Sequence, residues 1–464
     1  MKKSQFKLYF DKIAYKYRKK KSYYYGYLED YLKFIIPANK SVIELGCGTG
    51  QTLAALNPSF GVGVDFSSQM IEPAAKKYTQ YQFINEDIES FEFNNTFDYL
   101  LVSDVLGFLT DIQGFLENIK PLCNNSTRLV FTYYNWLWQP ILKLAELFKF
   151  KTQPPIQNWL NNQDLKNFMY LAGFEVIRSE NRLLCPIRIP LISFVLNEFF
   201  AKMPIINKLC LINYLIVRKL PEIEKIDYSV SIIIPTRNEA GTIENAVKRI
   251  PDFGESIEII FVEGNSTDNT LDKIQEIKQK YQGVYNIKCF VQEGKGKGDA
   301  VRKGFTEATG EILMILDGDL TVMPEELPKF YQALVTGKGE FINGSRLVYP
   351  LEKQSMRYLN MLGNKFFGMM FSWVLGQRLK DTLCGTKVLF KKDYEELARN
   401  RSFFGDFDPF GDFDLIFGAF KMNLKIIDLP IRYQDRKYGN TNISRFKHGL
   451  LLLKMLFFAF NKIK

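Results

Sequence analysis

Two acidic residues in the second half of the chain have the spacing of a metal site. Asp317 and Asp319 are separated by one glycine and follow the apolar run Ile-Leu-Met-Ile-Leu, which is typical of a buried strand. Two carboxylates at the end of such a strand can share a divalent ion such as Mg²⁺ or Mn²⁺. An ion held in this way can bridge the phosphates of a nucleotide and stabilise a departing diphosphate. The spacing is common by chance, so its weight depends on the motifs around it.

A glycine-rich loop in the first half of the chain is the second feature that predicts chemistry. Residues 42–50 read VIELGCGTG, so a buried strand leads into Gly46, Gly48 and Gly50, and a helix follows from about Thr52. Glycines allow the backbone to approach a ligand closely at the N-terminus of a helix. The spacing is GxGxG rather than the GxGxxG of dinucleotide sites, which predicts a different ligand.

Three acidic residues stand at or near the ends of successive predicted strands around this loop. Glu44 lies in the first strand, Asp65 follows FGVGV, and Asp87 follows YQFIN. Asp65 is placed to accept both hydroxyls of a ribose, and Asp87 to read the N6 group of an adenine. Carboxylates attract a sulfonium cation and repel the pyrophosphate of NAD. The set therefore favours a cationic nucleoside ligand.

The elements that must position these residues form two separate series of alternating strands and helices, which is the pattern of mostly parallel sheets. The first series runs from Ser41 to about Arg178, and the second starts at Val230. Between them lie apolar pieces broken by prolines and then the charged stretch PEIEKID. We therefore predict an α/β chain with domains at residues 1–182 and 228–445, an apolar helical extension and linker at 183–227, and a C-terminal amphipathic interfacial helix at 446–464.

The composition limits the classes of protein. A chain of 464 residues suggests two or three domains. The single histidine, His448, excludes histidine-based triads and multi-histidine zinc sites, and six cysteines without a CxxC pair fit a reducing compartment. A net charge of +10 suits an anionic partner. Because the N-terminus is not a signal peptide and no stretch is long enough to span a bilayer, we expect a cytoplasmic protein.

The first half resembles the class I S-adenosylmethionine-dependent methyltransferases over roughly residues 1–180. The resemblance implies a Rossmann-like sheet that binds S-adenosyl-L-methionine. It also implies a role for each motif residue, with the methionine part held by Gly46, Gly48 and Gly50, its amino group by Glu44, the ribose by Asp65 and the adenine by Asp87.

The sequence names no methyl acceptor. The residues that follow the later strands, where an acceptor pocket is expected, are Ser103, Asp104, Tyr133, Tyr134 and Trp136. Aromatic residues at strand ends are more often packing residues than recognition residues. Methyl transfer needs mainly alignment of the nucleophile with the donor, helped in some cases by one base, and Asp104 is the candidate for that catalytic role.

The second half, residues 228–445, resembles family 2 glycosyltransferases of the GT-A fold, and most of all dolichol-phosphate mannose synthase and related polyprenyl-phosphate glycosyltransferases. VSIIIPTRNEA, EIIFVEGNSTD and QEGKGKG precede the DGD motif in the family's order. The family more often has Asp where this chain has Glu263 and Asn265. The resemblance implies a nucleotide-sugar site with Pro235, Arg237, Glu239, Glu263 and Asp268 at the nucleoside, Lys297 and Asp317 at the phosphates, and the metal at Asp317 and Asp319.

Residues further along bear on the glycosyl acceptor. DLPIRYQDRKYGNTNISRF is similar to the element of polyprenyl-phosphate enzymes in which basic residues clamp an acceptor phosphate, a task that suits guanidinium groups. Asp412 stands at the general-base position of relatives that use hydroxyl acceptors, and a hydroxyl needs a base whereas a phosphate does not. Polyprenyl phosphate and a surface glycan both stay open as acceptors. The basic candidates are Arg346, Arg357, Lys387 and Arg436.

Three apolar stretches, at 189–217, 366–377 and 449–460, are too short to span a bilayer. The last has basic flanks, which favour an interfacial helix on an anionic membrane surface. Core helices or a dimer face are the alternative.

We predict a bifunctional transferase, peripheral at the inner face of the membrane. It would join methyl transfer to metal-dependent transfer from a nucleotide sugar to a polyprenyl-phosphate or glycan acceptor. The alternative is a glycosyltransferase whose first half binds S-adenosylmethionine only as a scaffold or regulator. A nucleic-acid partner is not expected, because the basic residues lie away from the predicted methyl site and no NPPY-like tetrapeptide is present.

Overall fold

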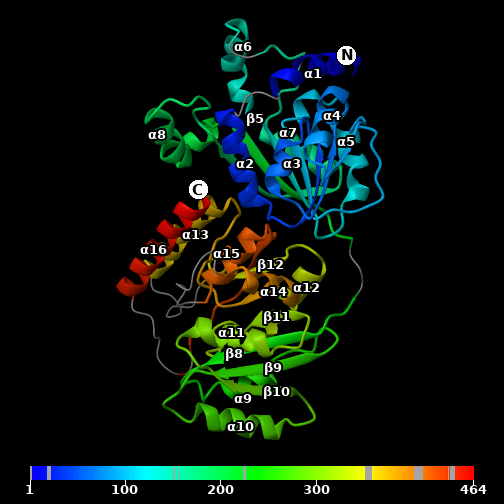
Figure 1. Ribbon diagram of the computed structural model, residues 1–464. Helices are drawn as coiled ribbons and strands as arrows, with labels where there is room; N and C mark the ends of the chain where they lie inside the picture. The colour runs from blue at the N-terminus through cyan, green and yellow to red at the C-terminus, as the bar shows by residue number, and fades with distance from the viewer. Residues whose placement is uncertain are drawn as a thin grey trace. The chain divides into compact units, whose positions relative to one another are not determined.

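The computed structural model describes residues 3–17, 22–149, 152–155, 157–222, 226–350, 358–401, 411–436, 438 and 445–464. The chain divides into two compact units, Met1–Pro221 and Glu222–Lys464 (Figure 1). Each unit contains its own mixed α/β sheet, which confirms the predicted fold class.

The first unit is built on a seven-stranded sheet with strand order β3-β2-β1-β4-β5-β7-β6. Strands β1 to β5 are parallel, whereas β7 runs antiparallel between β5 and β6. Because parallel strands end at the same edge of a sheet, the loops after β1 to β5 share that edge. The strands are β1 (Ser41–Leu45), β2 (Phe60–Val64), β3 (Gln82–Ile84), β4 (Tyr99–Ser103), β5 (Arg128–Tyr134), β6 (Phe174–Arg182) and β7 (Ile212–Lys219).

Helices cover both faces of this sheet (Figure 1). The helices are α1 (Lys3–Tyr17), α2 (Tyr23–Ile35), α3 (Gln51–Leu56), α4 (Ser68–Lys77), α5 (Ile112–Asn118), α6 (Gln139–Leu147), α7 (Asn162–Leu171) and α8 (Ile192–Glu198). Val42 of β1 packs in a core with Leu28 of α2, whereas its neighbour Ile43 packs in the opposite core with Phe115 of α5. Burial on both faces explains why these strands read as continuous apolar runs.

The end of the first unit differs from the boundary expected at residue 182. Residues 212–219, which the sequence analysis placed in an apolar extension, form β7 and hydrogen-bond β5 on one side and β6 on the other. This run is apolar because the strand is buried in the sheet, from Ile212 to Val217. The rest of the extension connects β6 to β7 through α8 and the short 3₁₀ turns η4 (Phe200–Lys202) and η5 (Ile206–Leu209).

The second unit has a seven-stranded sheet with strand order β10-β9-β8-β11-β13-β12-β14. Strands β10, β9, β8 and β11 are parallel, β13 is antiparallel to its neighbours β11 and β12, and β14 is parallel to β12. The strands are β8 (Val230–Thr236), β9 (Ile257–Glu263), β10 (Asn286–Val291), β11 (Ile312–Ile315), β12 (Phe341–Ser345), β13 (Lys387–Phe390) and β14 (Ile426–Pro430).

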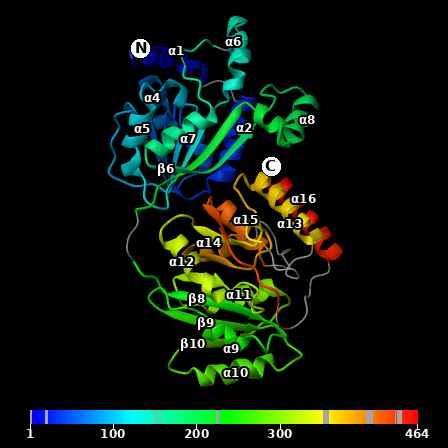
Figure 2. The ribbon, with the colours of Figure 1, turned by 180° about the vertical axis from the view of Figure 1, so that it is seen from behind.

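The helices of the second unit pack on this sheet and on each other. They are α9 (Ile243–Lys248), α10 (Thr270–Lys280), α11 (Lys297–Glu307), α12 (Leu327–Val335), α13 (Tyr358–Leu375), α14 (Lys391–Arg399), α15 (Phe413–Lys421) and α16 (Arg445–Ile463). Helices α13 and α16 lie side by side, as Figure 2 shows from behind. Helix α13 contains most of the apolar stretch at 366–377, and α16 contains the stretch at 449–460. Among the helices of the described residues, none combines the length and apolar character needed to cross a membrane.

Candidate active sites

The glycine loop after β1 has a backbone shape that suits glycine. Gly46, Gly48 and Gly50 all have positive φ, at 81°, 53° and 69°. A Cβ on Gly46 would lie 2.3 Å from a methyl group of Val105, and one on Gly50 would lie 2.5 Å from the Phe83 ring. A Cβ on Gly48 would meet nothing within 4 Å. The loop therefore brings bare backbone to the carboxyl edge of the sheet, where α3 begins.

Two buried carboxylates hold this loop. Asp65, directly after β2, accepts hydrogen bonds from the backbone N–H groups of Gly48 and Ser67, each at 2.9 Å. Glu44 accepts one from the N–H of Leu53 in α3 at 3.0 Å. Burial raises the pKa of both carboxyl groups, that of Glu44 to about 8. Because a cation would favour the ionised forms, this environment fits the ammonium and sulfonium groups of a methyl donor.

The third predicted carboxylate, Asp87, lies beside helix α1. The Lys3 Nζ atom is 2.7 Å from Asp87 Oδ2 and 3.0 Å from Glu89 Oε2. Phe10 of α1 packs edge-on against Phe66, which follows Asp65. Helix α1 therefore contacts the loops after β2 and β3. Glu44 near the end of β1, Asp65 after β2 and Asp87 after β3 lie at three neighbouring strands. The contribution of α1 was not part of the prediction.

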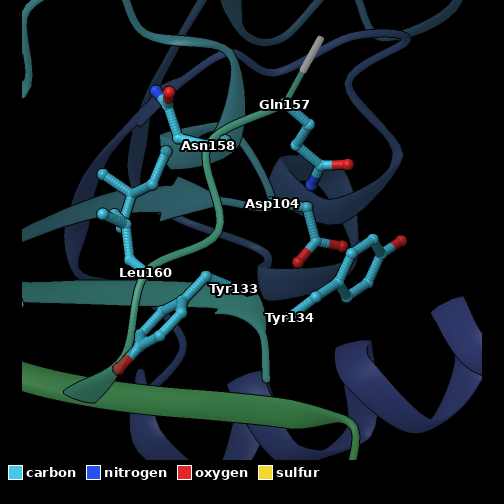
Figure 3. Close-up of a pocket in the computed structure, with 8 residues that line it drawn as sticks. Asp104, Tyr133, Tyr134, Gln157, Asn158 and Leu160 are labelled. Atoms are coloured by element: carbon cyan, nitrogen blue, oxygen red, sulfur yellow. The ribbon is translucent and has the colours of Figure 1, made fainter. Parts of the chain in front are cut away.

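A pocket opens at the ends of β4 and β5 (Figure 3), and Asp104 stands at it with a φ of 56°. The Tyr24 hydroxyl donates to Asp104 Oδ2 at 2.6 Å, and the Thr132 hydroxyl donates to Asp104 Oδ1 at 3.1 Å. Figure 3 shows the Asp104 carboxylate beside the Tyr134 ring, with Gln157 extending toward Asp104. The pocket is lined by Asp104, Leu106, Gly107, Tyr133, Tyr134, Gln157, Asn158 and Leu160.

This lining includes three of the five residues expected at the acceptor pocket. Ser103 and Trp136 are not among the lining residues, and Trp136 is 49% exposed. Tyr24, which the sequence analysis did not single out, holds the Asp104 carboxylate from α2. A contact across 80 residues leaves no local signal in the sequence.

In the second unit, Asp317 forms an ion pair with Lys297, the first residue of α11. Burial opposes the ionisation of Asp317, but the charge and hydrogen bond of Lys297, together with the charges of Lys387 and Arg346, outweigh burial and lower the pKa of Asp317. A Cβ on Gly385 would lie 2.1 Å from Asp317 Oδ2 and 2.2 Å from Lys297 Nζ, so a side chain at this position would force the ion pair or the loop to shift. Gly385 belongs to the segment DTLCGTK at residues 381–387.

Asp319 is paired with a second cation. The Arg436 Nη2 atom is 2.7 Å from Asp319 Oδ2 and 3.3 Å from Glu239 Oε1. Burial raises the pKa of Glu239 to about 7, against the opposing effect of Arg436. Arg436 thus links the loop after β8 to the DGD motif after β11. Within the described part of the chain, no three His, Cys, Asp or Glu side chains form a cluster that could hold a metal ion.

The residues expected around the nucleoside lie at the ends of β8 and β9. Glu263 accepts hydrogen bonds from the N–H groups of Asn265 and Ser266, and Asp268 accepts from the N–H and hydroxyl of Thr270. These two carboxylates therefore hold the shape of their own loop. Three more residues were expected at the nucleoside. Glu239 is paired with Arg436, Pro235 is half-buried in β8, and Arg237 is exposed.

The basic residues expected at the acceptor are engaged within the unit. The Arg346 guanidinium forms two parallel hydrogen bonds to the buried Asp381, at 2.7 and 2.8 Å. Lys387 is fully buried, and its Nζ atom is 2.8 Å from Asp412 Oδ1. Arg357 lies outside the described residues. Asp381, a partner 35 residues from Arg346, was not predicted, although it begins the motif DTLCGTK.

Comparison with known proteins gives one family for each half of the chain. Residues 17–179 match a methyltransferase domain, and residues 231–397 match glycosyl transferase family 2. Both resemblances that the motifs indicated are confirmed by these matches.

Two curated relatives match the second half. Glycosyltransferase AglJ of Haloferax volcanii is 26% identical over 231 residues, which cover 49% of this chain and 71% of the relative. A dolichol-phosphate mannosyltransferase of Pyrococcus furiosus is 30% identical over 219 residues, 46% of this chain and 59% of the relative.

Solved structures align with each half in turn. A Haloferax volcanii complex of the Trm112 methyltransferase activator with a putative methyltransferase aligns with 46% of this chain and 98% of that chain, at 18% identity and a TM-score of 0.34. Glucosyl-3-phosphoglycerate synthase of Mycobacterium tuberculosis, solved with Mn²⁺, UDP and its product, aligns with 51% of this chain and 80% of that chain, at 17% identity and a TM-score of 0.37.

Proposed function

Since the chain joins a methyltransferase domain to a glycosyltransferase family 2 domain, we propose that it is a bifunctional transferase that uses a nucleotide sugar and S-adenosyl-L-methionine. One observation carries the sugar-transfer part of the proposal. Asp317 and Asp319 follow β11 and are each paired with a cation, Lys297 and Arg436, at the carboxyl edge of the parallel strands. Alternating charges at that edge of an open α/β sheet suit a ligand that carries phosphates and a metal ion.

The residues present fit a divalent metal ion. Asp317 and Asp319 supply the hard carboxylate oxygens that Mg²⁺ or Mn²⁺ prefers, and two carboxylates leave coordination positions for phosphate oxygens. The ion would stabilise the negative charge that develops on the departing diphosphate. Lys297, at the N-terminus of α11, adds a positive charge beside the same phosphates.

We propose a phosphate as the glycosyl acceptor, with polyprenyl phosphate as its class. The Asp412 carboxylate is buried and already accepts from the buried Lys387, so it is engaged within the protein and not exposed to an acceptor hydroxyl. A phosphate acceptor is an anion and needs no base, whereas a sugar hydroxyl would need one. Arg436, which is 24% exposed and lies at the DGD motif, is the cation we assign to the acceptor phosphate.

For methyl transfer we propose the site between the glycine loop and the pocket at Asp104. The methyl group moves from the donor sulfur to a nucleophilic atom of the acceptor, the S–CH₃ bond breaks, and the acceptor loses its proton. Asp104, held by Tyr24 and Thr132, is placed to take that proton. Binding of the donor without turnover would instead support the role of a scaffold.

Attachment to a membrane surface is supported by helices α13 and α16. Their outer positions include Met369, Leu450 and Phe457, which are 64, 71 and 67% exposed. Exposed Lys454 and Lys462 lie on the same α16 helix. Apolar and basic residues together suit a helix that lies on an anionic bilayer, which is where a polyprenyl phosphate is found.

The test is to incubate the purified protein with a panel of nucleotide sugars, Mg²⁺ or Mn²⁺ and polyprenyl phosphate, and to analyse the lipid phase by mass spectrometry. A glycosylated lipid that disappears with EDTA supports the proposal. Transfer to soluble glycans alone, with no lipid product from any nucleotide sugar, contradicts the assigned acceptor.

A further inference from the structure

Two stretches of the first unit, residues 136–149 and 187–209, expose an excess of apolar side chains. Nearly half of the large hydrophobic side chains that the described residues expose lie in these two stretches. Ile205 is 82% exposed, Leu191 76% and Leu147 73%. We call residues 136–149 and 187–209 the apolar surface. Concentrations of this kind mark sites of interaction rather than ordinary solvent-facing surface.

Helix α8, within this surface, has its polar and apolar sides reversed. Its buried residues are Ser193 and Asn197, and the exposed ones include Ile192, Phe194 and Val195. The two buried side chains make hydrogen bonds to the surrounding chain, so this orientation is built into the fold. A helix that faced water would show the opposite pattern. The outer side of α8 is therefore suited to an apolar environment.

Helix α6 also exposes apolar side chains. It is rich in Leu and Ile, but none of its residues is fully buried. Ile141, Leu144 and Leu147 are each more than half exposed, and so is Phe148 directly after the helix. A helix of about nine residues is only marginally stable by itself, and in proteins it is stabilised by packing of its apolar face. An apolar partner outside this unit would supply that packing.

The apolar surface is connected to the pocket at Asp104 through β5. Asn135 directly follows Tyr134, a pocket residue, and begins the turn that leads into α6. The Asn135 side chain donates to the carbonyl oxygens of Lys208 at 2.8 Å and Cys210 at 2.9 Å. One buried side chain thus holds both stretches of the surface beside the end of β5.

A second connection runs through α2. The Asn197 amide of α8 donates to the Tyr23 hydroxyl at 3.1 Å. The neighbouring residue, Tyr24, donates to Asp104 at 2.6 Å. The reversed helix and the pocket are therefore anchored to consecutive residues of one helix.

The charges on the apolar surface indicate the chemistry of the partner. The exposed basic residues are Lys143, Lys149, Arg188 and Lys208, whereas Glu198 is the one exposed acid of these two fully described stretches. Lysine is depleted at the centres of protein interfaces, but basic residues among Trp, Phe and Leu are typical of surfaces that lie on anionic lipids. The surface thus matches a negatively charged bilayer better than a protein partner.

We propose that the apolar surface docks on an anionic lipid bilayer and that the methyl acceptor is a lipid-linked molecule whose polar head enters the pocket at Asp104. The second half of this inference rests on the proposed methyl transfer, but the docking does not. It assigns to the first unit a membrane contact separate from α13 and α16. It also names the class of acceptor that the sequence left open.

Vesicle sedimentation of the full-length protein tests the docking. All proteins carry Phe457→Glu, which weakens any contribution from α16. They are mixed either with vesicles of phosphatidylcholine alone or with vesicles that also contain about 30% phosphatidylglycerol, which gives the surface a negative potential. Phe194→Glu and Ile205→Glu should each weaken binding to the anionic vesicles at least about tenfold, because a large apolar side chain no longer enters the bilayer. Val284→Glu, a matched change at a side chain 70% exposed in the other unit, should leave binding unchanged.

A labelling experiment tests the acceptor. The protein is incubated with methyl-labelled S-adenosyl-L-methionine and a lipid extract of the source cells, and the product is partitioned between organic and aqueous phases. Label is expected in the organic phase, and Phe194→Glu should reduce it while leaving the affinity for S-adenosylhomocysteine, measured by calorimetry, unchanged.

Several results would overturn the inference. Equal vesicle binding by Phe194→Glu, Ile205→Glu and Val284→Glu contradicts the docking. A protein that does not bind vesicles but forms a dimer that Phe194→Glu dissociates would identify a second copy as the partner. Label confined to the aqueous phase contradicts the lipid-linked acceptor. If the unaltered protein does not bind S-adenosylhomocysteine, the proposed methyl transfer is refuted. The sedimentation result would still decide whether the apolar surface docks on a bilayer.

Discussion

Replacing Gly385 by alanine is the sharpest test of the charge arrangement at the DGD motif. The added Cβ would lie 2.1 Å from Asp317 Oδ2 and 2.2 Å from Lys297 Nζ, well inside contact distance of both charged atoms. Either the ion pair opens or the loop that carries Gly385 moves. The first outcome displaces Asp317, the carboxylate assigned to the metal and the phosphates, and the second removes the loop that packs against it.

The size of the effect follows from the local packing. Overfilling a packed site costs about 1–3 kcal/mol, and a hydrogen bond between charged groups contributes about 1.5–3 kcal/mol. Both partners keep about a quarter of their side-chain surface exposed, so the lower end of each range applies. We expect Gly385→Ala to lower the free energy of unfolding by about 2–3 kcal/mol. Sugar transfer should fall about a hundredfold, since a displacement of about 1 Å at a reacting centre has that effect.

The assay combines urea unfolding with transfer of labelled sugar. Gly363→Ala in α13 is the matched control, because its Cβ would meet nothing within 4 Å and alanine favours a helix. That control should keep full transfer and the same or greater stability. A Gly385→Ala protein with wild-type transfer and stability would refute the argument, because it would show that Asp317 and Lys297 need no fixed contact.

Three further predictions test the two sites separately. Asp319→Asn removes one charge from the proposed metal site, so sugar transfer should be lost while the circular dichroism spectrum and the melting temperature stay close to wild type. Full activity of this variant, or of the unaltered protein in EDTA, would contradict the metal role. Asp65→Ala should weaken donor binding about tenfold or more in calorimetry, because the ribose loses a charged acceptor worth about 1.5–3 kcal/mol, while sugar transfer stays near wild type. The pKa of Glu44 is raised to about 8, so the carboxyl is protonated at pH 6 and must lose its proton to accept a cation. Donor affinity should therefore rise with pH up to about 8 and then level off, and Glu44→Gln should bind the donor more weakly and equally at every pH. A pH dependence that survives this substitution would show that another group causes it.

The sequence predicted those parts of both sites that depend on local spacing. The glycine loop, the acids at the ends of β1 to β3 and the DGD motif each combine a strand with residues in it or close after it. Their positions follow from the rule that parallel strands end at one edge of a sheet. The matches to two families confirm the overall assignment that these motifs indicated.

The pairings across long distances in the chain could not be predicted in the same way. Lys3 reaches Asp87 across 84 residues, and Arg436 reaches Asp319 across 117. Neither end of such a pair has a neighbour in sequence that marks it as half of an ion pair. The roles of Arg346 and Lys387 were predicted from charge alone, and the structure shows each engaged with an acid of its own unit.

Strand β7 was hidden for a different reason. A strand buried in a sheet reads as a continuous apolar run, and so does a surface helix that faces lipid. The run at 189–217 contains both, the exposed side of α8 followed by the buried β7. Hydropathy alone could not separate them, because the two environments select the same residue types.

The two ion pairs at the DGD motif have a consequence for the order in which ligands bind. Lys297 and Arg436 already neutralise the carboxylates, so a free divalent ion must compete with two cations that are attached to the protein. A nucleotide sugar brings two negative phosphates that can take over Lys297, while Arg436 is the cation we assign to the acceptor phosphate. Metal and nucleotide then enter together as an exchange of ions that leaves the net charge of the site almost unchanged. We therefore expect the proposed metal site to bind a free divalent ion only weakly until the sugar donor is present.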